Sequence, residues 1–290
     1  ALAAQSEIAV LVMGDHAGLF GRGTTGEGCD VDSLELPGVQ RDLVEAVLAT
    51  GKPVVLVLVT GRPYAIGWAL ERCAAVVQSF FPGEEGGTAI ARVLAGAVAP
   101  SGRMPISMPR NAGSAPYSYL HPRLGGPTTV TNLDTTPPVA FGHGLTYTSF
   151  ERTNLSVTPE HGTQGVITAS VEVRNTGRRA GTDVVQLYAH DPVASVTRPV
   201  AQLVAFTRVD LEPGQCARVT FEVPTTRVSF SDRDLVRVVE PGELQLWVGP
   251  DCATRETEAT TTLVGEVHRV TAQDERLSRA VVVPVEPATV

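Results

Sequence analysis

The chain has 290 residues, of which 43% are hydrophobic and 19% are charged, so it is long enough for about two globular domains and is not typical of disorder. The net charge is −8, divided into −3 for residues 1–150 and −5 for residues 151–290. Neither part has the basic excess that binding to a phosphate backbone requires, which argues against nucleic acid as a partner. The longest aliphatic run, Val54–Val59, is far shorter than the roughly 20 residues of a membrane span, so membrane insertion is not predicted.

The first part of the chain alternates short apolar runs with helical patterns. Continuous Val, Ile and Leu are typical of strands that are covered on both faces of a parallel sheet; such runs occupy Ile8–Met13, Val54–Val59 and Ala74–Phe80. Helical spacing predicts helices over residues 39–48, 64–72 and 86–95. This order predicts a doubly wound α/β domain with right-handed crossovers. Glu84 and Glu85 precede the third helix, where carboxylates complement the dipole and cap the helix.

One connection is unusually long. Gly14–Leu36 spans 23 residues without a helical period, and loops longer than about 12–15 residues are usually functional or disordered. It follows the carboxyl end of a predicted parallel strand, where α/β sheets bind their ligands. Gly21–Gly26 matches the dinucleotide pattern GxGxxG, but it neither follows a strand directly nor opens a helix. The loop is therefore a candidate site, though not for a nucleotide.

Several charged residues of this loop are candidates for chemistry. Glu27 lies between Gly26 and Gly28, and small neighbours let the backbone bring a carboxylate into a confined site. Asp15, directly after the strand, either faces a ligand or forms a turn. The candidate substrate-binding residues are Asp15, Arg22 and Asp30, while Asp32 and Glu35 are interpreted as solvated charges.

Metal and thiol chemistry have no candidates in the sequence. The four cysteines, Cys29, Cys73, Cys216 and Cys252, form no CxxC pair and are interpreted as buried free thiols. The histidines show no ligand spacing, and His143, between two glycines, is interpreted as structural. No GxSxG elbow or Cys–His pair indicates a nucleophile. We therefore predict no metal and no cofactor.

The second part of the chain has a period of two. Apolar and polar residues alternate over 169–173, 217–223 and 244–248, with Pro-Gly or Asn-Thr-Gly turns between the runs. About seven such strands predict an antiparallel sandwich of immunoglobulin type. The alternation places Trp247 on the outward face. The predicted organisation is an α/β domain over 1–137, a connecting segment over 138–150, a β-sandwich domain over 151–267 and a loosely ordered tail over 268–290.

Seven sequence blocks, taken in order, carry a resemblance to a known family. They are Gly-Glu-Gly-Cys-Asp (26–30), Leu-Glu-Leu-Pro-Gly (34–38), Gly-Lys-Pro-Val-Val-Leu-Val-Leu (51–58), Thr-Gly-Arg-Pro (60–63), Phe-Phe-Pro-Gly-Glu-Glu-Gly-Gly (80–87), Pro-Ser-Gly-Arg-Met-Pro (100–105) and Phe-Gly-His-Gly-Leu-Thr-Tyr (141–147). To about residue 267 the chain closely resembles glycoside hydrolase family 3, the β-glucosidases and β-xylosidases.

The resemblance implies an architecture and a catalytic residue. The resemblance implies that members consist of a (β/α)8 barrel, followed by an (α/β)6 sandwich domain and often by a fibronectin type III-like domain. This chain would then be the second half of the sandwich domain plus the fibronectin-like domain. The nucleophile of the family is an aspartate on the barrel, and the acid/base falls on Glu27. The sequence departs from many relatives at Cys29, where they carry an aromatic residue, and at Val31, where they carry Arg. These two differences are expected to change the local contacts of the loop and hence the substrate preference.

These implications give a function and an alternative. The chain would supply the general acid/base of a retaining, exo-acting β-glycosidase acting on short β-linked glucosides or xylosides, with the barrel as its partner. The alternative is a non-catalytic fragment or interaction module. The first strand begins close to Ala1 with no secretion signal before it, which predicts that the chain is a piece of a longer polypeptide. The sequence leaves open glucoside against xyloside, the compartment, and whether the protein forms a homo-oligomer.

Overall fold

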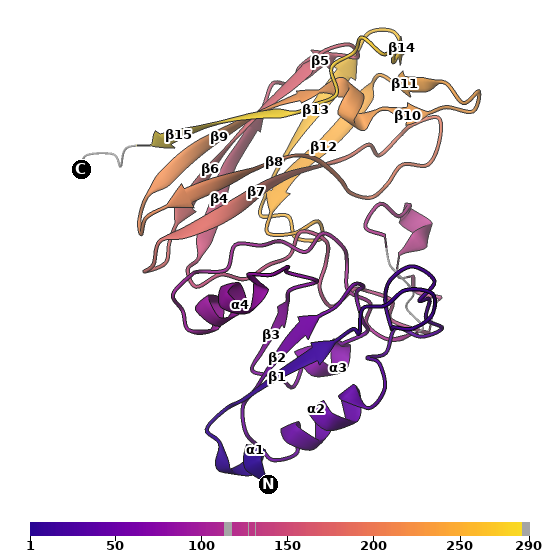
Figure 1. Ribbon diagram of the computed structural model, residues 1–290. Coiled ribbons are helices and arrows are strands. Elements are labelled where there is room, and N and C mark those ends of the chain that lie inside the picture. Colours follow the sequence, from indigo (N-terminus) through magenta and orange to yellow (C-terminus); the bar gives the residue numbers. More distant parts are fainter. Residues whose placement is uncertain (113–117, 127, 131, 286–290) are drawn as a thin grey trace. The chain divides into compact units, whose positions relative to one another are not determined.

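The computed structural model describes residues 1–112, 118–126, 128–130 and 132–285, and it divides into two compact units (Figure 1). The first unit consists of Ala1–Val98 and two later segments that end at Val139. The second consists of Ala99–Pro105, Ser118–Thr128 and the chain from Ala140 onward. In the described part of the chain, no helix is long and apolar enough to cross a membrane.

The first unit is built on a three-stranded parallel sheet in the order β1-β2-β3 (Figure 1). The strands are β1 (Ala9–Gly14), β2 (Val54–Val59) and β3 (Ala75–Gln78), and the helices are α1 (Leu2–Gln5), α2 (Gln40–Leu48), α3 (Gly67–Leu70) and α4 (Gly86–Leu94). The three predicted strands and three predicted helices are therefore confirmed, together with the α/β fold class. The second predicted helix, over 64–72, is shorter than expected, because only Gly67–Leu70 is α-helical.

Burial differs among the three strands. The central strand β2 is buried along almost its whole length, as the continuous apolar run predicts. In β1, Val10 and Val12 are 50% and 62% exposed, because α2 packs on this strand from one side only. The expectation that all three runs are covered on both faces is thus correct for β2 alone. Glu85 is the N-cap residue of α4, but its side chain makes no capping hydrogen bond, so the predicted capping role is wrong.

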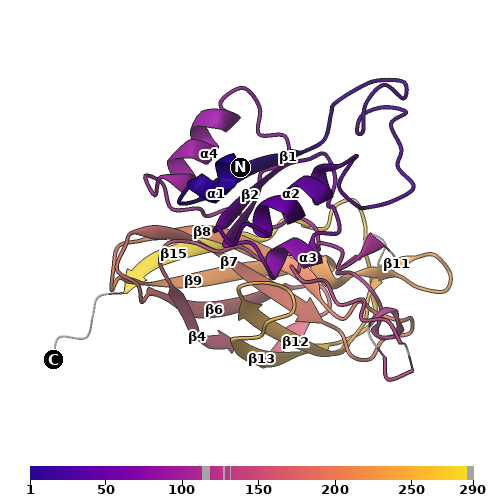
Figure 2. The ribbon, with the colours of Figure 1, turned by 90° about the horizontal axis from the view of Figure 1, so that it is seen from below.

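The second unit is a β-sandwich (Figures 1 and 2). One sheet has the order β5-β13-β12-β7-β8, formed by Glu160–Gly162, Thr257–Val264, Gly242–Gly249, Gly181–His190 and Gln202–Leu211. The other has the order β15-β9-β6-β4, formed by Arg279–Val285, Cys216–Pro224, Val166–Asn175 and Phe150–Val157. A small third sheet joins β10 (Phe230–Ser231), β11 (Arg237–Val239) and β14 (His268–Arg269), and short 3-10 helices lie at η2 (Arg123–Gly125) and η3 (Thr225–Val228).

The core of the sandwich follows the predicted alternation. Val171, Val219, Phe221 and Leu246 are fully buried between the two sheets. Every second residue of a strand points to the same face, so these positions give both sheets one apolar side. The sandwich predicted from the period of two is confirmed.

The outward face of β12 at Trp247 is covered by other residues. The Trp247 side chain leaves the main core, as the alternation predicts, but it is only 1% exposed. Its ring stacks on Tyr188 with centroids 5.6 Å apart, and Tyr119 and Phe141, stacked at 3.9 Å, pack against the same cluster. The period of two distinguishes the faces of a strand, but does not show that another segment covers the outer face.

The predicted loosely ordered tail contains a strand, so this prediction is wrong for that segment. Arg279–Val285 forms β15 and pairs antiparallel with β9, from Arg279 opposite Glu222 to Val285 opposite Cys216. It is an edge strand, where Pro284 is tolerated because one side of the strand needs no ladder hydrogen bonds. Residues 286–290 lie outside the described residues.

Candidate functional site

The long loop starts from a firmly bonded point at the carboxyl end of β1. The side chain of Gln40 accepts a hydrogen bond from the Gly14 N–H at 2.7 Å and donates one to the Gly14 carbonyl at 2.7 Å. The next amide, of Asp15, donates to the carbonyl of Val59 at 2.9 Å. The first residue of helix α2 and the last residue of strand β2 therefore hold the backbone where the loop begins.

Asp15 uses its carboxylate to bind the protein itself. Oδ1 accepts hydrogen bonds from the Tyr64 hydroxyl and from Thr24 Oγ1 at 2.7 Å, and Oδ2 accepts one from the Gly61 amide at 2.8 Å. Burial, with a further contribution from the adjacent Asp15 carboxylate, raises the pKa of Tyr64, so the phenol keeps its proton and donates it. Asp15 thus joins three parts of the first unit that are far apart in sequence.

The glycines of the loop allow two of its segments to lie in contact. The Gly18 amide donates to the Thr25 carbonyl at 2.9 Å, and Ala17 and Thr25 form a bridge. A Cβ on Gly26, whose φ is +126°, would lie 1.9 Å from the Gly18 carbonyl oxygen. The glycines of the GxGxxG match therefore serve contacts within the loop, and the next helix, α2, begins only at Gln40.

The backbone of Glu27 is fixed by a hydrogen bond, whereas its side chain is exposed. Its carbonyl accepts a hydrogen bond from the Phe20 amide at 2.8 Å, and the following Gly28 has φ +69°. The neighbouring Cys29 is 3% exposed and directs its thiol to the Glu27 carbonyl at 3.8 Å. The Glu27 side chain is exposed, and its carboxylate has no hydrogen bond or ion pair with the described residues.

Arg22 and Asp30 lie on the same loop as Glu27, and both are exposed. Neither side chain forms a hydrogen bond or an ion pair with the described residues. The structure therefore places the four candidate residues in one loop, but only Asp15 is bonded through its side chain.

Arg62 and Tyr64 make hydrogen bonds to the candidate loop that were not predicted from the sequence. The Arg62 guanidinium donates to the Cys29 carbonyl at 2.9 Å, and Tyr64 donates to Asp15. Both follow β2 within or next to the Thr-Gly-Arg-Pro block. Because α/β sheets bind ligands at the carboxyl ends of their strands, this position after β2 could have marked both residues as candidates. The block anchors the candidate loop.

Glu35 is not merely a solvated charge. Its carboxylate lies 3.0 Å from Arg41 Nη1, while Arg41 Nε lies 2.9 Å from Glu45. Arg41 also lies over the ring of Trp68, 5.0 Å from its centroid. These contacts tie the end of the loop to α2, and the neighbouring Asp32 remains exposed as predicted.

In the second unit, two of the resemblance blocks are hydrogen-bonded to each other. The Met104 amide donates to the His143 carbonyl and the Gly142 amide donates to the Met104 carbonyl, both at 2.8 Å. A Cβ on Gly144 would lie 2.2 Å from the Gly102 carbonyl oxygen. His143 Nδ1 lies 3.3 Å from Asp251 Oδ2, which agrees with a structural role. Among the described residues, no three His, Cys, Asp or Glu side chains form a metal-binding group.

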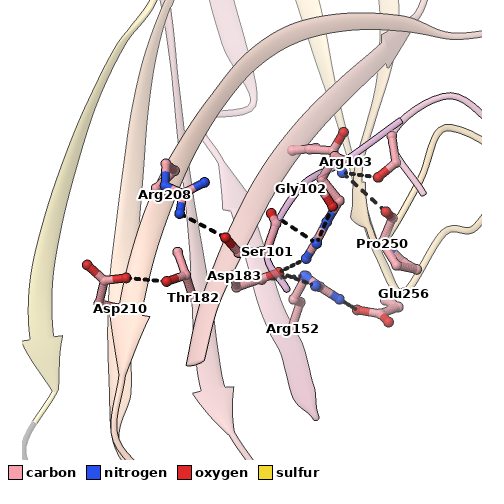
Figure 3. A network of polar contacts seen from close by, with 12 residues as sticks. Ser101, Gly102, Arg103, Arg152, Thr182, Asp183, Arg208, Asp210, Pro250 and Glu256 are labelled. Atoms are coloured by element: carbon pink, nitrogen blue, oxygen red, sulfur yellow. Dashed lines mark hydrogen bonds and ion pairs between the residues drawn. The ribbon is translucent and has the colours of Figure 1, made fainter. Parts of the chain in front are cut away.

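A buried ionic network holds the first of these blocks (Figure 3). Asp183, with a fully buried side chain, receives Arg152 Nε and Nη2 at 2.8 and 2.6 Å and Arg103 Nη2 at 3.0 Å. Arg152 also reaches Glu256 at 2.9 Å. Burial opposes the charge of Arg152, but the two carboxylates outweigh it and raise its pKa, whereas burial lowers the pKa of Arg103. This network is structural, because its charges are already paired with one another.

The cysteines are free thiols in the described structure. Cys29 is buried, as predicted, but Cys73, Cys216 and Cys252 are half-buried. Burial raises the pKa of Cys252 to about 12, so its thiol stays protonated near neutral pH. Burial also raises the pKa of Cys73 and of Cys216, so these three thiols are not activated as nucleophiles.

Comparisons with known proteins agree with this geometry. Residues 1–147 match the glycosyl hydrolase family 3 C-terminal domain, and residues 183–252 match a fibronectin type III-like domain. The periplasmic β-glucosidase of Salmonella typhimurium is 38% identical over 262 residues, covering 87% of this chain and 34% of that protein. A β-xylosidase of Formosa agariphila is 38% identical, covering 85% of this chain and 34% of the relative.

Solved structures show the same fold. A β-glucosidase from Erythrobacter marinus superposes with a TM-score of 0.82 at 40% identity, covering 91% of this chain and 35% of that one. A β-glucosidase from Listeria innocua in complex with glucose gives a TM-score of 0.82 at 31% identity, covering 90% of this chain and 37% of that one. The chain thus spans about a third of the length of these relatives. The family match covers half of the chain, and on that basis the chain belongs to glycosyl hydrolase family 3.

Proposed function

We propose that this chain supplies the general acid/base of a retaining, exo-acting β-glycosidase, a β-glucosidase or β-xylosidase, and that Glu27 is that residue. The observation that carries the proposal is the combination at Glu27 of a backbone fixed by the Phe20 amide with an exposed, unpaired carboxylate. Family membership supports it, because the relatives include proteins named β-glucosidase and β-xylosidase. The nucleophile is proposed to lie on a barrel domain outside this chain.

The proposed chemistry assigns two steps to Glu27. A retaining glycosidase places two carboxyl groups about 5–5.5 Å apart, one as nucleophile and one as acid and then base. In the first step Glu27 would protonate the leaving oxygen as the nucleophile attacks the anomeric carbon. In the second step the same group, now a carboxylate, would take a proton from the water that releases the sugar. Carrying the acid on a loop lets it approach the sugar from the side opposite the nucleophile's domain.

The other candidate residues have supporting roles in this proposal. Arg22 and Asp30 are exposed on the loop of Glu27 and are proposed to contact the substrate through hydroxyl groups. Asp15 has both carboxylate oxygens engaged by Tyr64, Thr24 and Gly61. We therefore propose that Asp15 affects substrate binding by fixing the loop, without touching the sugar.

The test uses the enzyme that includes the barrel. Glu27→Ala is expected to lower turnover of a natural disaccharide by about 10²–10⁴-fold, the usual contribution of general acid–base catalysis. Formation of the glycosyl-enzyme from a dinitrophenyl glycoside is expected to be spared, because that leaving group departs without a proton. Azide is expected to restore turnover by replacing water at the accumulated intermediate.

Asp32→Ala is the matched control, since Asp32 is an exposed carboxylate of the same loop. It is expected to retain activity on both substrates. Equal losses for Glu27→Ala on good and poor leaving groups, with no effect of azide, would place the acid elsewhere. The 290-residue chain alone is expected to be inactive on an aryl β-glucoside or β-xyloside, and measurable turnover would contradict the proposed division of the two carboxyl groups.

A further inference from the structure

A pocket of about 430 Å³ lies at one end of the β-sandwich, far along the chain from the candidate loop. Its lining comes from Tyr119 and Leu120, from the connection between β7 and β8 and the start of β8, from η3, and from β10 and β11. This volume lies within the range of small-molecule sites, about 300–1,000 Å³. It is therefore large enough for a monosaccharide or an inorganic anion.

Three arginines line the pocket: Arg198, Arg227 and Arg237. Among the described residues that line it, none is Asp or Glu. Arg198 is ion-paired with Asp191, which does not line the pocket, with Oδ2 at 3.6 Å from Nε. In a chain with a net charge of −8, this is a local concentration of positive charge.

Each guanidinium donates to a neutral acceptor, and Arg198 is in addition ion-paired with Asp191. Arg198 Nη2 donates to the Val228 carbonyl at 2.8 Å, and Arg227 donates to the carbonyls of Leu203 and Val204 at 3.2 and 3.3 Å. Arg237 Nε donates to Ser229 Oγ at 2.9 Å. Guanidiniums oriented in this way keep further N–H groups for a ligand at little conformational cost.

Arg198 is largely removed from solvent. Its side chain is 10% exposed and lies over the Phe230 ring, 4.3 Å from the centroid. Its buried Nε has no hydrogen-bond partner among the described residues. Burial lowers the pKa of Arg198 and the positive charge of Arg237 lowers it further, while the carboxylates of Asp191 and Glu240 oppose this shift. A bound anion would relieve the repulsion between Arg198 and Arg237.

We propose that this pocket binds a small oxyanion, either the carboxylate of an acidic sugar or an inorganic oxyanion such as phosphate. Guanidinium groups recognise both through paired N–H···O contacts. Hydroxyl and amide groups of Tyr119, Ser231 and Gln202 also line the pocket and suit the hydroxyls of a sugar ring. The site lies outside the proposed catalytic loop and does not depend on the assignment of Glu27.

The test is calorimetric titration of the full chain with glucuronate, with phosphate and, as the neutral counterpart, with glucose. Saturable binding of glucuronate or phosphate is expected, and glucose is expected to bind at least tenfold more weakly than the better anion. Arg237→Ala is expected to weaken anion binding by about tenfold or more, as for loss of a charged hydrogen bond. This residue is exposed, so the variant is expected to fold, which circular dichroism checks.

Arg233→Ala is the matched control, because it removes the same charge from the turn that leads to β11 but does not line the pocket. It is expected to bind the anions as the unaltered chain does. Glucuronate binding above phosphate would identify an acidic sugar as the source, and the reverse would identify an inorganic anion. The proposal is overturned if neither anion binds saturably or if glucose binds as tightly as the better anion. It is also overturned if Arg233→Ala and Arg237→Ala weaken anion binding equally.

Discussion

Arg103 and Asp183 are 80 positions apart in the sequence, yet Arg103 Nη2 donates to Asp183 Oδ1 at 3.0 Å inside the second unit. Asp183 is completely buried, and the Arg103 side chain is 9% exposed. Two charges removed from water in this way are stable only when each has its partners. The contact therefore fixes the Pro-Ser-Gly-Arg-Met-Pro block to the sandwich.

Asp183→Ala is expected to lower the free energy of unfolding by about 3–5 kcal/mol, because it leaves Arg103 and Arg152 buried without their shared carboxylate. Urea denaturation of the full chain, followed by circular dichroism, measures this change. Glu258→Ala breaks an exposed pair with Arg255 and is expected to cost less than about 1 kcal/mol. Similar small losses in the two variants would show that the network contributes nothing.

The stability of the second unit is expected to fall in acid through Asp251. Burial alone would raise the pKa of this carboxyl, but hydrogen bonds from His143, Thr254 and Ala253 outweigh it and hold the pKa below 3.8. A depressed pKa in the folded state means that the contribution to stability is complete above pH 3.8 and is lost as the pH falls further. Acid therefore removes it by protonating the carboxylate.

Asp251→Asn tests this directly. The variant is expected to be less stable than the unaltered chain by about 1.5–3 kcal/mol at pH 7, the range for hydrogen bonds to a charged group. Urea denaturation at several pH values is expected to show this difference shrinking below pH 3.8. Asp234→Asn, an exposed turn residue, is expected to make no difference at any pH. A gap between Asp251→Asn and the unaltered chain that stays constant in acid would exclude the linkage.

Asp15 and Tyr64 are expected to act as a coupled pair. Asp15→Asn and Tyr64→Phe each weaken the contact that holds the candidate loop, so their double variant is expected to lose less stability than the two losses added together. A double-mutant cycle on unfolding free energies is expected to give a coupling of about 0.5–3 kcal/mol. Strict additivity would argue against the pair.

In the enzyme with the barrel, the same two variants give a catalytic readout. Both are expected to lower kcat and also to raise KM, because the loop that Asp15 and Tyr64 hold carries Glu27 together with the proposed substrate contacts Arg22 and Asp30. Azide is expected to give no rescue in either variant, since the acid itself remains. Rescue by azide of Asp15→Asn would instead assign the acid/base role to Asp15.

The sandwich is expected to be structural and not a carbohydrate-binding module. Trp247 is buried against Tyr188 and lies under Arg255, 4.1 Å from its ring centroid, so it cannot stack on a glycan. The full chain is therefore expected to show no saturable pull-down on xylan or cellulose. Saturable capture would favour the alternative of an interaction module.

The regular elements were predictable because each has a local signature. The run Val54–Val59 marks β2 to the residue, and the alternation around Val219 and Leu246 assigns the inner faces of the sandwich. The burial of Trp247 and the strand conformation of Arg279–Val285 depend on distant segments of the chain, which cover the tryptophan and pair with the strand. Periodicity contains no information about such partners.

The candidate site was predictable in part for the same reason. The flanking glycines of Glu27 are local, and the structure shows why Gly26 is required, since a Cβ would lie against the Gly18 carbonyl. The three donors to Asp15 come from Thr24, Gly61 and Tyr64, and two of these lie beyond strand β2. Only the fold brings them together, so the sequence left the role of Asp15 open.

The interleaved course of the chain limits how this protein can be recombined with its relatives. Ala99–Pro105 and Ser118–Thr128 belong to the second unit, although both precede the end of the first at Val139. A single crossover placed near residue 138 would inherit Arg103 from one parent and Asp183 from the other. The two units are therefore expected to be exchanged between homologues as one block, and chimeras that divide them are expected to survive only where both parents supply a matching arginine and aspartate.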